Sequence, residues 1–477
     1  MNFETVIGLE VHLQLNTATK IFCGCRNAFG SDANTRVCPV CLGLPGSLPV
    51  FNRKVLFLGM KVGLALNCRI NTFVKFDRKN YYYPDLPKGY QISQYDFPIA
   101  KHGFLPVMTG GKEKRIGITR AHFEEDAGKL IHDQAIHATL VDYNRTGTPL
   151  VEIVSEPDMR SAQEAYDYLT ALKLTLQYLN VSDCDMEKGS LRCDANVSIR
   201  PVGEKALGTK TELKNMNSFS AVKRAIEYEV ARQSRMALAG EPIVQQTLLW
   251  NEEQGITLPM RSKEQAHDYR YFPEPDLVPF TLSQKEIDEV QQTLPELPYV
   301  RLNRLIRQYG ISTYDGIILV QDKSFADFFE AAVAMPVDVK KLCNWMNVQL
   351  MKEMNDRKCR VSDLKLTPAE LVALVNKVED GTLSNLAGKD VLADMVVSGK
   401  SVDRIIQDKG LAQTADASVL EKIVDDVINE NPQVVAQIRS GKASAAGFLV
   451  GQAMKRMPCQ VNPKKINELI QRRIPNV

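Results

Sequence analysis

Four cysteines near the start of the chain have the spacing of a metal site. Cys23 and Cys25 form one close pair, and Cys38 and Cys41 form a second pair after twelve intervening residues. Two close pairs of thiolates are typical of a structural, tetrahedral zinc site, in which four protein ligands leave no open position. We therefore predict one Zn²⁺ bound by these residues. The alternative is four unrelated cysteines, like the six that are scattered through the rest of the chain.

Carboxylates and a histidine occur within apolar segments that read as strands. Glu10 and His12 are two residues apart, so they project from the same face of a strand, and Glu152 lies inside an apolar run. A charge in a buried strand is costly unless it is paired or bound to a metal. Carboxylates with one histidine suit Mg²⁺, although each side chain taken alone could simply face solvent. Three further acids end another apparent strand: Glu124, Glu125 and Asp126.

Cationic residues occur in three polar or aromatic segments. Lys79 precedes a run of tyrosines, Lys214 lies in a segment of alternating charge, and Arg270 lies in the aromatic, proline-rich segment 268–276. Cations near a carboxylate-bound Mg²⁺ are what phosphoryl transfer requires, because its catalysis is mainly positioning and charge neutralisation. The alternative for each segment is an ordinary network of surface salt bridges.

Several common nucleotide and metal motifs are missing from the sequence. There is no G-x-x-x-x-G-K-[ST] motif, since the Gly399-Lys400-Ser401 segment lacks the upstream glycine. There is also no G-x-G-x-x-G and no H-E-x-x-H. These absences disfavour a P-loop ATPase, a Rossmann enzyme and a zincin metalloprotease.

The elements that position these residues change character along the chain. Residues 5–15 and 191–200 alternate with period two, and Asp194 lies on the polar face of the second segment. Such half-polar strands usually form antiparallel sheets. Between them, residues 161–180 have a helical apolar stripe behind a serine that can cap the helix.

Beyond Pro298 the apolar period becomes helical. Thr367 and Pro368 open one clear helix, and the proline-rich stretch 293–298 is the best candidate linker. We therefore predict an α+β fold with an all-α continuation. The predicted domains are a catalytic domain at 1–293, a helical domain at 294–405 and a small basic helical tail at 406–477.

Composition and charge narrow the class of protein. The chain is 44% apolar and 24% charged, and it has no apolar run long enough to span a bilayer and no recognisable signal peptide. We expect a cytoplasmic protein without membrane contact. The segment from residue 439 carries +7 against −5 for the preceding residues, which suggests an anionic partner such as nucleic acid. A solvated helical tail explains the charge equally well. Its cations are Arg439, Lys442, Lys455, Arg456, Lys464, Lys465, Arg472 and Arg473.

The chain closely resembles the B-subunit family of heterotrimeric Asp/Glu-tRNA amidotransferases. The resemblance runs from residue 4 to about residue 470. It is carried by the ordered segments 6–12 (VIGLEVH), 75–81 (KFDRKNY), 124–129 (EEDAGK), 153–158 (IVSEPD), 189–196 (GSLRCDAN), 269–276 (YRYFPEPD) and 447–452 (GFLVGQ).

The resemblance implies a fold and a reaction. The fold would be a cradle related to glutamine synthetase and guanidino kinases, followed by helical and tRNA-contacting parts. The reaction would use ATP to phosphorylate the side-chain carboxylate of Glu on tRNA(Gln), or Asp on tRNA(Asn). Ammonia from a glutaminase A subunit would then displace phosphate, and a small C subunit would complete the heterotrimer. The sequence leaves open which tRNA is used.

With this resemblance, residues can be assigned roles. We expect Glu10, His12, Glu125 and Glu152 to bind Mg²⁺, with Glu124 as the alternative to Glu125. We expect phosphate or acyl-end contacts from Lys79, Asp194, Lys214 and Arg270, with Lys79 and Arg270 binding ATP. Two other functions stay open: an enzyme that phosphorylates a free carboxylate substrate, and a non-catalytic, tRNA-binding zinc protein.

Overall fold

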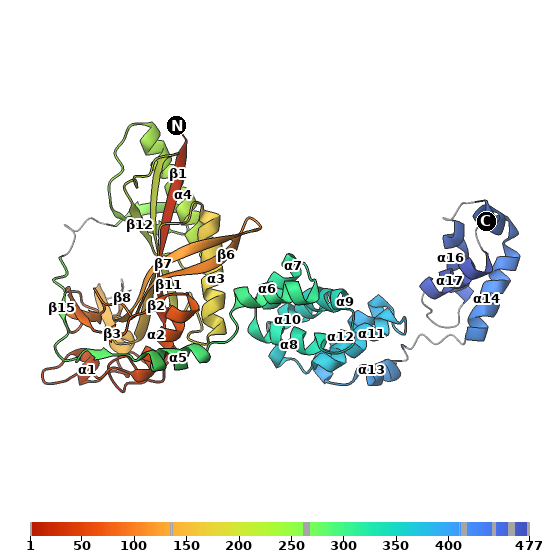
Figure 1. The fold of residues 1–477 in the computed structure, drawn as a ribbon, viewed down its shortest axis with the longest axis horizontal. Coiled ribbons are helices and arrows are strands. Elements are labelled where there is room, and N and C mark those ends of the chain that lie inside the picture. Colours follow the sequence, from red (N-terminus) through yellow and green to blue (C-terminus); the bar gives the residue numbers. More distant parts are fainter. Residues whose placement is uncertain are drawn as a thin grey trace. The chain divides into compact units, whose positions relative to one another are not determined.

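A computed structural model describes residues 2–133, 135, 137–260, 268–409, 411, 417–440, 445–456 and 463–474. The chain divides into two compact units, residues 1–299 and 300–477, which are described separately (Figure 1). Among the described residues, no helix is both long and apolar enough to cross a membrane.

A nine-stranded sheet dominates the first unit. Its strand order is β14-β13-β12-β11-β1-β10-β7-β6-β2. Neighbouring strands are antiparallel, as predicted, except for the parallel pair β12–β13, between which helix α4 makes the crossover. The strands are β1 (Phe3–Gln14), β2 (Arg69–Ile70), β6 (Ala100–Thr109), β7 (Lys112–Glu125), β10 (Pro149–Ser155), β11 (Leu191–Pro201), β12 (Thr211–Lys214), β13 (Thr247–Asn251) and β14 (Ile256–Pro259).

Three helices cover one face of this sheet. They are α2 (Arg53–Ala65), α3 (Ala162–Tyr178) and α4 (Phe219–Leu238). Their apolar stripes form one core with the inward residues of the central strands, such as Val11 and Val151, both fully buried. The helix predicted at 161–180 is α3, and the Ser161 side chain accepts from the Glu164 N–H, as expected of a cap. The opposite face of the central strands is therefore free to carry polar residues.

Small elements surround the end of β7. A three-stranded sheet has the order β15-β4-β5, from β4 (Asp77–Asn80), β5 (Tyr90–Ser93) and β15 (Phe272–Pro273). The remaining elements of this unit are α1 (Pro39–Leu42), β3 (Phe73–Val74) paired with β16 (Phe280–Thr281), β8 (Lys129–Asp133) paired with β9 (Ala138–Asp142), η1 (Tyr143–Arg145) and α5 (Gln284–Gln292).

The second unit is helical in its described residues and contains two separate apolar clusters. One cluster draws on residues 302–406 and the other on residues 420–474. The predicted cap Thr367 accepts from the Glu370 N–H at the start of α11. The helices from Pro298 onward are α6 (Pro298–Tyr309), α7 (Thr313–Val320), α8 (Lys323–Val333), α9 (Val339–Asn344), η2 (Trp345–Leu350), α10 (Met351–Arg357), η3 (Val361–Asp363), α11 (Pro368–Glu379), α12 (Asn385–Ser398), α13 (Val402–Lys409), α14 (Ala417–Glu430), α15 (Pro432–Arg439), α16 (Ala446–Arg456) and α17 (Pro463–Arg473).

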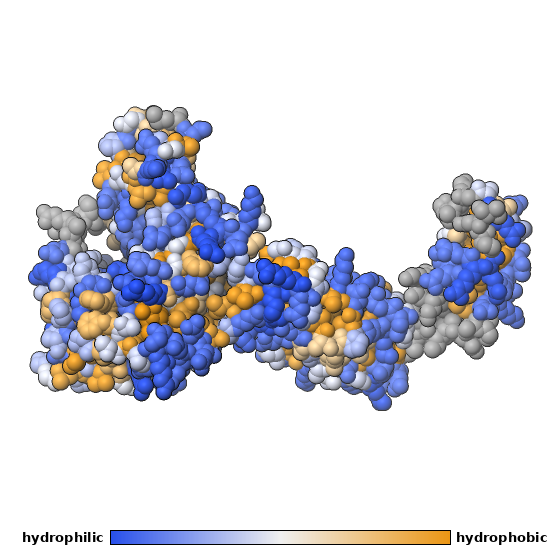
Figure 2. Space-filling model, viewed as in Figure 1, coloured by the Kyte–Doolittle hydropathy of each residue, from blue (hydrophilic) through white to orange (hydrophobic). Residues whose placement is uncertain are grey.

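The fold is thus mixed α and β, with a large sheet and many helices, as the alternating and helical segments indicated. Polar residues cover much of the face seen in Figure 2, with apolar patches between them. The two predicted boundaries between the three domains remain predictions, although the division between compact units falls at residues 299 and 300, close to the predicted linker.

The packing of α2 on β7 gives a test of the fold. A Cβ atom on Gly59 would lie 2.2 Å from Cε1 of the fully buried Phe123. We expect Gly59→Ala to lower the free energy of unfolding by about 1–3 kcal/mol through overpacking. Gly451→Ala in α16 is the control, since no atom of another described segment lies within 4 Å of its added Cβ; its helix should be stabilised by up to about 1 kcal/mol. Urea unfolding measures both, and a neutral Gly59→Ala would contradict the packing.

Candidate functional site

Polar side chains line up across the uncovered face of the sheet. Residue His12 on β1 is opposite Glu152 on β10, and Glu152 is opposite His122 on β7. Directly opposed residues project from the same face of an antiparallel sheet, with side chains within reach of one another. The register of three strands therefore brings these groups together, although they are far apart in sequence.

Two carboxylates meet around His122. The Glu124 Oε1 and Glu152 Oε2 atoms each lie 3.3 Å from His122 Nε2, and Glu152 Oε2 lies 3.5 Å from His12 Nε2. One ligand atom from each of His12, Glu124 and Glu152 lies within 4.8 Å of the other two. We call these three residues the carboxylate cluster.

Glu124 is buried, His12 and Glu152 are partly buried, and the cluster is largely hydrogen-bonded. Gln91 Nε2 and Ser93 Oγ, both on β5, donate to the two oxygens of Glu124 at 3.2 and 3.0 Å. Burial alone would lower the pKa of His122, but its hydrogen bonds to Glu124 and Glu152 raise that pKa to about 9. The Nδ1 atom of His122 has no partner among the described residues.

The pKa values of Glu124 and Glu152 are lowered, whereas that of His122 is raised. Burial by itself raises the pKa of Glu124 and of Glu152, but the hydrogen bond and positive charge of His122 hold both values below the ordinary range. Burial alone would lower the pKa of Lys79, yet the charge of Glu124 holds it above its usual value. The cluster is therefore anionic and faces a lysine, as a site for a cation and a phosphate would require.

A second polar row adjoins the first. Glu10 is opposite Asp194 on β11, and the Asn196 amide donates to Glu10 at 3.0 Å. Lys214 Nζ lies 2.5 Å from Asp194 and 2.9 Å from Glu212. Burial and the negative charge of Glu152 raise the pKa of Glu10. An excess of negative charge thus extends across both rows.

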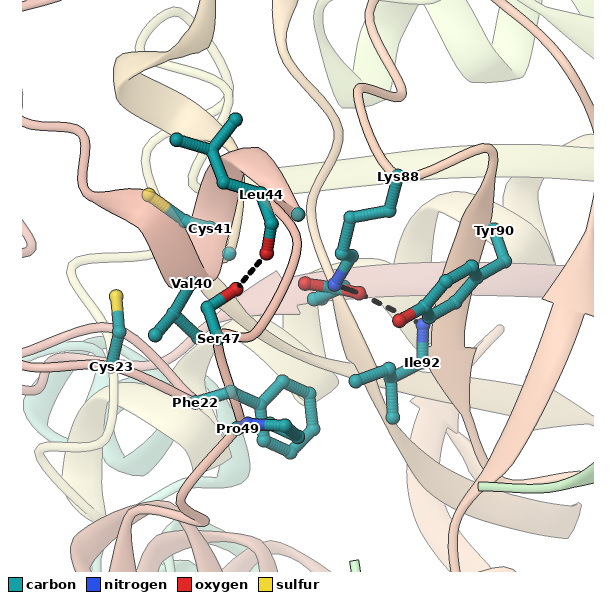
Figure 3. Close-up of a pocket in the computed structure, with 13 residues that line it drawn as sticks. Phe22, Cys23, Val40, Cys41, Leu44, Ser47, Pro49, Lys88, Tyr90 and Ile92 are labelled. Carbon is teal, nitrogen blue, oxygen red and sulfur yellow. Dashed lines mark hydrogen bonds and ion pairs between the residues drawn. The ribbon is translucent and has the colours of Figure 1, made fainter. Parts of the chain in front are cut away.

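Glu125 does not lie in this cluster, contrary to the expectation from the sequence. Its carboxylate forms a buried ion pair with Lys88 and accepts from the Ile92 N–H at 2.9 Å. These contacts line a small cavity of about 60 Å³ beside Cys23 and Cys41, where Lys88 and Ile92 are drawn in Figure 3. Consecutive residues of a strand face opposite sides, so the acid on the site's side is Glu124, the alternative in the sequence analysis.

The sequence analysis did not identify His122 as a residue of the site, and the contacts of Arg270 could not be predicted from it. His122 escaped notice, although its position two residues before Glu124 in an apparent strand is a usable signal. Within the described part of the chain, the Arg270 guanidinium makes no hydrogen bond or ion pair, and its backbone φ is +44°. Residues 261–267, which precede it, lie outside the described residues.

The four N-terminal cysteines form a second candidate site. One sulfur atom from each lies within 4.8 Å of the others. Helix α1, which contains Cys41, ends at Gly43, whose φ of +67° is in the left-handed region. The fully buried Lys20 places Nζ 3.6 Å from the Cys41 sulfur and 2.8 Å from the Arg36 carbonyl. A hydrogen bond from Cys23, aided by the charge of Lys20, lowers the pKa of Cys41 despite its burial.

The donor atoms suit two different metals. Four clustered sulfurs match tetrahedral Zn²⁺. Two carboxylates with one imidazole, next to a lysine, match a hard cation that shares its coordination with phosphate oxygens, as Mg²⁺ does. Burial and then the negative charge of Glu152 raise the pKa of Glu10, and that negative charge would also favour a cation there.

Comparison with known proteins gives a consistent result. Residues 5–288 match the GatB/GatE catalytic domain, and residues 327–474 match the GatB domain. The B subunit of aspartyl/glutamyl-tRNA(Asn/Gln) amidotransferase from Moorella thermoacetica is 52% identical over 476 residues, which are 99% of this chain and 100% of the relative. Proteins of the same name from Carboxydothermus hydrogenoformans and Brevibacillus brevis are 51% and 50% identical, and each match covers 98% of both chains.

The cysteine geometry predicts metal binding that a single substitution removes. Purified, reduced protein should contain about one zinc per chain, because four thiolates complete a tetrahedral site. Cys38→Ser should lose that zinc and lower the melting temperature, while Cys359→Ser, at a cysteine outside the cluster, should retain both. Elemental analysis and thermal unfolding measure the two effects; wild-type protein without zinc would contradict the prediction.

Proposed function

Because the chain belongs to the family of aspartyl/glutamyl-tRNA(Asn/Gln) amidotransferase B subunits, a family of tRNA-dependent ligases, we propose that it activates a tRNA-bound carboxylate with ATP for amidation. The substrate is Glu on tRNA(Gln), Asp on tRNA(Asn), or both. The observation that carries the proposal is the carboxylate cluster of His12, Glu124 and Glu152, which is largely shielded from solvent and lies in the electrostatic field of Lys79.

The chemistry explains why such a site needs ATP. A carboxylate is a poor acceptor for ammonia because hydroxide is a poor leaving group. An oxygen of the side-chain carboxylate attacks the γ-phosphorus of ATP, the bond to the bridging oxygen breaks, and ADP leaves. Ammonia then attacks the acyl carbon and gives up one proton, which the departing phosphate can take. Phosphate leaves with the former carboxylate oxygen, and an amide remains.

The cluster residues hold the charges that this transfer requires. Mg²⁺ bound by His12, Glu124 and Glu152 would neutralise phosphate charge and align the transferring group. Lys79 supplies a fixed positive charge next to the cluster. His122 links the two carboxylates and keeps them ionised, so that they remain available as ligands.

The residues of the second polar row and Arg270 would bind the parts of the substrates that the carboxylate cluster does not contact. Glu10 extends the anionic surface, so it would bind the cation directly or through water. Lys214 is oriented by Asp194 and Glu212 and would contact a phosphate or the acyl end. Arg270 lies on the segment that pairs with β4 and would complete the ATP contacts.

Ammonia and further binding surfaces would come from partner subunits. The sequence has no amidase-like serine–lysine pattern, so ammonia would be delivered by a glutaminase A subunit, with a small C subunit completing a heterotrimer in the cytoplasm. The antiparallel sheet with helices on one face supports a cradle fold like that of glutamine synthetase and guanidino kinases. A sheet with one apolar face packed on helices and one polar face that carries acids favours an enzyme over a non-catalytic zinc protein.

The C-terminal helices would contact tRNA. Arg456 and Arg473 pair with the acids Glu430 and Asp425 of α14. Lys455 and Arg472 are exposed and have no ion pair among the described residues of this segment. Lys442 lies outside the described residues, as do the side chains of Lys464 and Lys465. A basic surface on a helical tail favours a tRNA substrate over a free carboxylate substrate.

The carboxylate cluster is tested by removing one charge at a time. Glu124→Gln and Glu152→Gln should each lower the kcat of ATP-dependent amidation by about a hundredfold or more, because each would remove a ligand from the cation that holds the phosphoryl group. The loss should appear in kcat as well as in KM. Glu10→Ala should also abolish amidation. The assay is amide formation on charged tRNA by the assembled complex.

Two controls separate this effect from general damage. Glu227→Gln removes an exposed carboxylate of α4 and should leave kcat unchanged. The basal glutaminase activity of the partner should persist in all the variants. Near-normal amidation by both Glu124→Gln and Glu152→Gln would refute the proposed site.

The role of the tail is tested through the salt dependence of tRNA binding. The double variant Lys455→Gln/Arg472→Gln should weaken binding and reduce the slope of log affinity against log salt by roughly 0.7–0.9 for each phosphate that is no longer neutralised. ATP affinity should not change. Arg456→Gln/Arg473→Gln is the matched control, because these cations already have acidic partners. An unchanged slope for the first double variant would show that these two cations do not contact tRNA.

A further inference from the structure

A partly exposed cluster of tyrosines lies beside the carboxylate cluster. The rings of Tyr95 and Tyr271 are stacked, with centroids 4.3 Å apart and planes at 15°. Tyr269 meets Tyr271 edge-on at 6.1 Å, and Tyr81 meets Tyr269 at 6.2 Å. We call these four residues the tyrosine shelf. Tyr95 is 55% exposed and Tyr269 is 36% exposed, whereas Tyr81 and Tyr271 are half-buried. The shelf therefore presents aromatic surface to solvent mainly through Tyr95 and Tyr269.

The shelf adjoins the proposed catalytic groups through two elements. Strand β5 ends at Ser93, whose hydroxyl donates to Glu124, and Tyr95 follows two residues later, in the bend that comes after the strand. On the neighbouring strand β4, Lys79 places its Nζ 5.0 Å from the centroid of the Tyr269 ring. A ligand on the shelf would therefore lie within reach of both Lys79 and Glu124.

The backbone of the shelf is held in place. The Tyr95 N–H donates to the buried carboxylate of Asp77 at 3.0 Å. The Asn80 N–H donates to the Tyr269 carbonyl at 2.9 Å. A bidentate hydrogen bond from Arg78 to the buried Glu274, at 2.7 and 2.8 Å, holds the segment that follows Tyr271 against β4. Rings that are anchored in this way lose little entropy when a flat ligand stacks on them.

We propose that the tyrosine shelf stacks against the base of the 3′-terminal nucleotide of the charged tRNA. This inference rests on the proposed function, because the amino acid to be activated is esterified to the ribose of that nucleotide. Single-stranded ends of RNA are bound by stacking on aromatic side chains, with nearby cations on the backbone. An exposed shelf suits a base that arrives on a macromolecule. The adenine of ATP has the same stacking chemistry and is distinguished by the test.

The test measures binding to the assembled complex, without ATP turnover. The probes are uncharged tRNA, the same tRNA trimmed of its terminal nucleotide, and ATP. Tyr95→Ala should raise the Kd of intact tRNA about fivefold or more, the loss expected for one stacked base. It should leave the Kd of trimmed tRNA and of ATP unchanged. Tyr95→Phe, which keeps the ring, should bind intact tRNA like the wild type.

Controls cover misfolding and nonspecific effects. Tyr95→Leu keeps apolar volume without a flat ring and should reproduce the loss seen with alanine, with an unchanged melting temperature. Tyr314→Ala removes a tyrosine that is 73% exposed in the second unit and should have no effect.

Three outcomes would overturn the proposal: an unchanged Kd for intact tRNA, an equal penalty for trimmed tRNA, or a penalty on ATP alone. The last outcome would assign the shelf to the adenine of ATP. Failure of the proposed function is separate, because a complex that binds the tRNA end through the shelf but forms no amide would refute the reaction and leave the shelf intact.

Discussion

The arrangement of the site depends on two carboxylates that are held side by side and largely shielded from water. Glu124 and Glu152 both lie within 3.3 Å of one imidazole nitrogen and are largely removed from water. Like charges at that spacing cannot both stay ionised unless positive charge is close by. His122 and Lys79 supply it here, and a divalent cation would add more. Glu124 and Glu152 therefore stay ionised, as ligands of the proposed cation would have to be.

The sheet is what makes this arrangement possible. One face of the central strands packs against α2, α3 and α4, which fixes the strand register because a slip of one residue would bury the polar face. The register in turn aligns His12, Glu152 and His122 across three strands to form a row. The smaller sheet of β4, β5 and β15 then closes the site from the side with Gln91, Ser93 and Lys79. Hydrophobic packing on one face thus positions the charges on the other.

Much of this could be predicted from the sequence, because the relevant patterns are local. Period-two alternation identified the strands that carry Glu10, His12 and Asp194, and close spacing identified the cysteine cluster. The choice between Glu124 and Glu125 depended on which face of β7 each one occupies, and only a full reading of the alternation through His122 separates them. The parallel β12–β13 pair and the pairing of β15 with β4 join distant segments. Such long-range contacts leave no periodic signal in either segment.

The central claim is that the side-chain carboxylate is phosphorylated before it is amidated, and oxygen transfer tests it most directly. Charged tRNA would be prepared with ¹⁸O in the side-chain carboxylate of the attached Glu or Asp and incubated with the complex, ATP and glutamine. Mass spectrometry of the released phosphate should find one ¹⁸O atom for each amide formed, because the carboxylate oxygen leaves with the phosphorus. Unlabelled phosphate, formed together with amide, would contradict this mechanism.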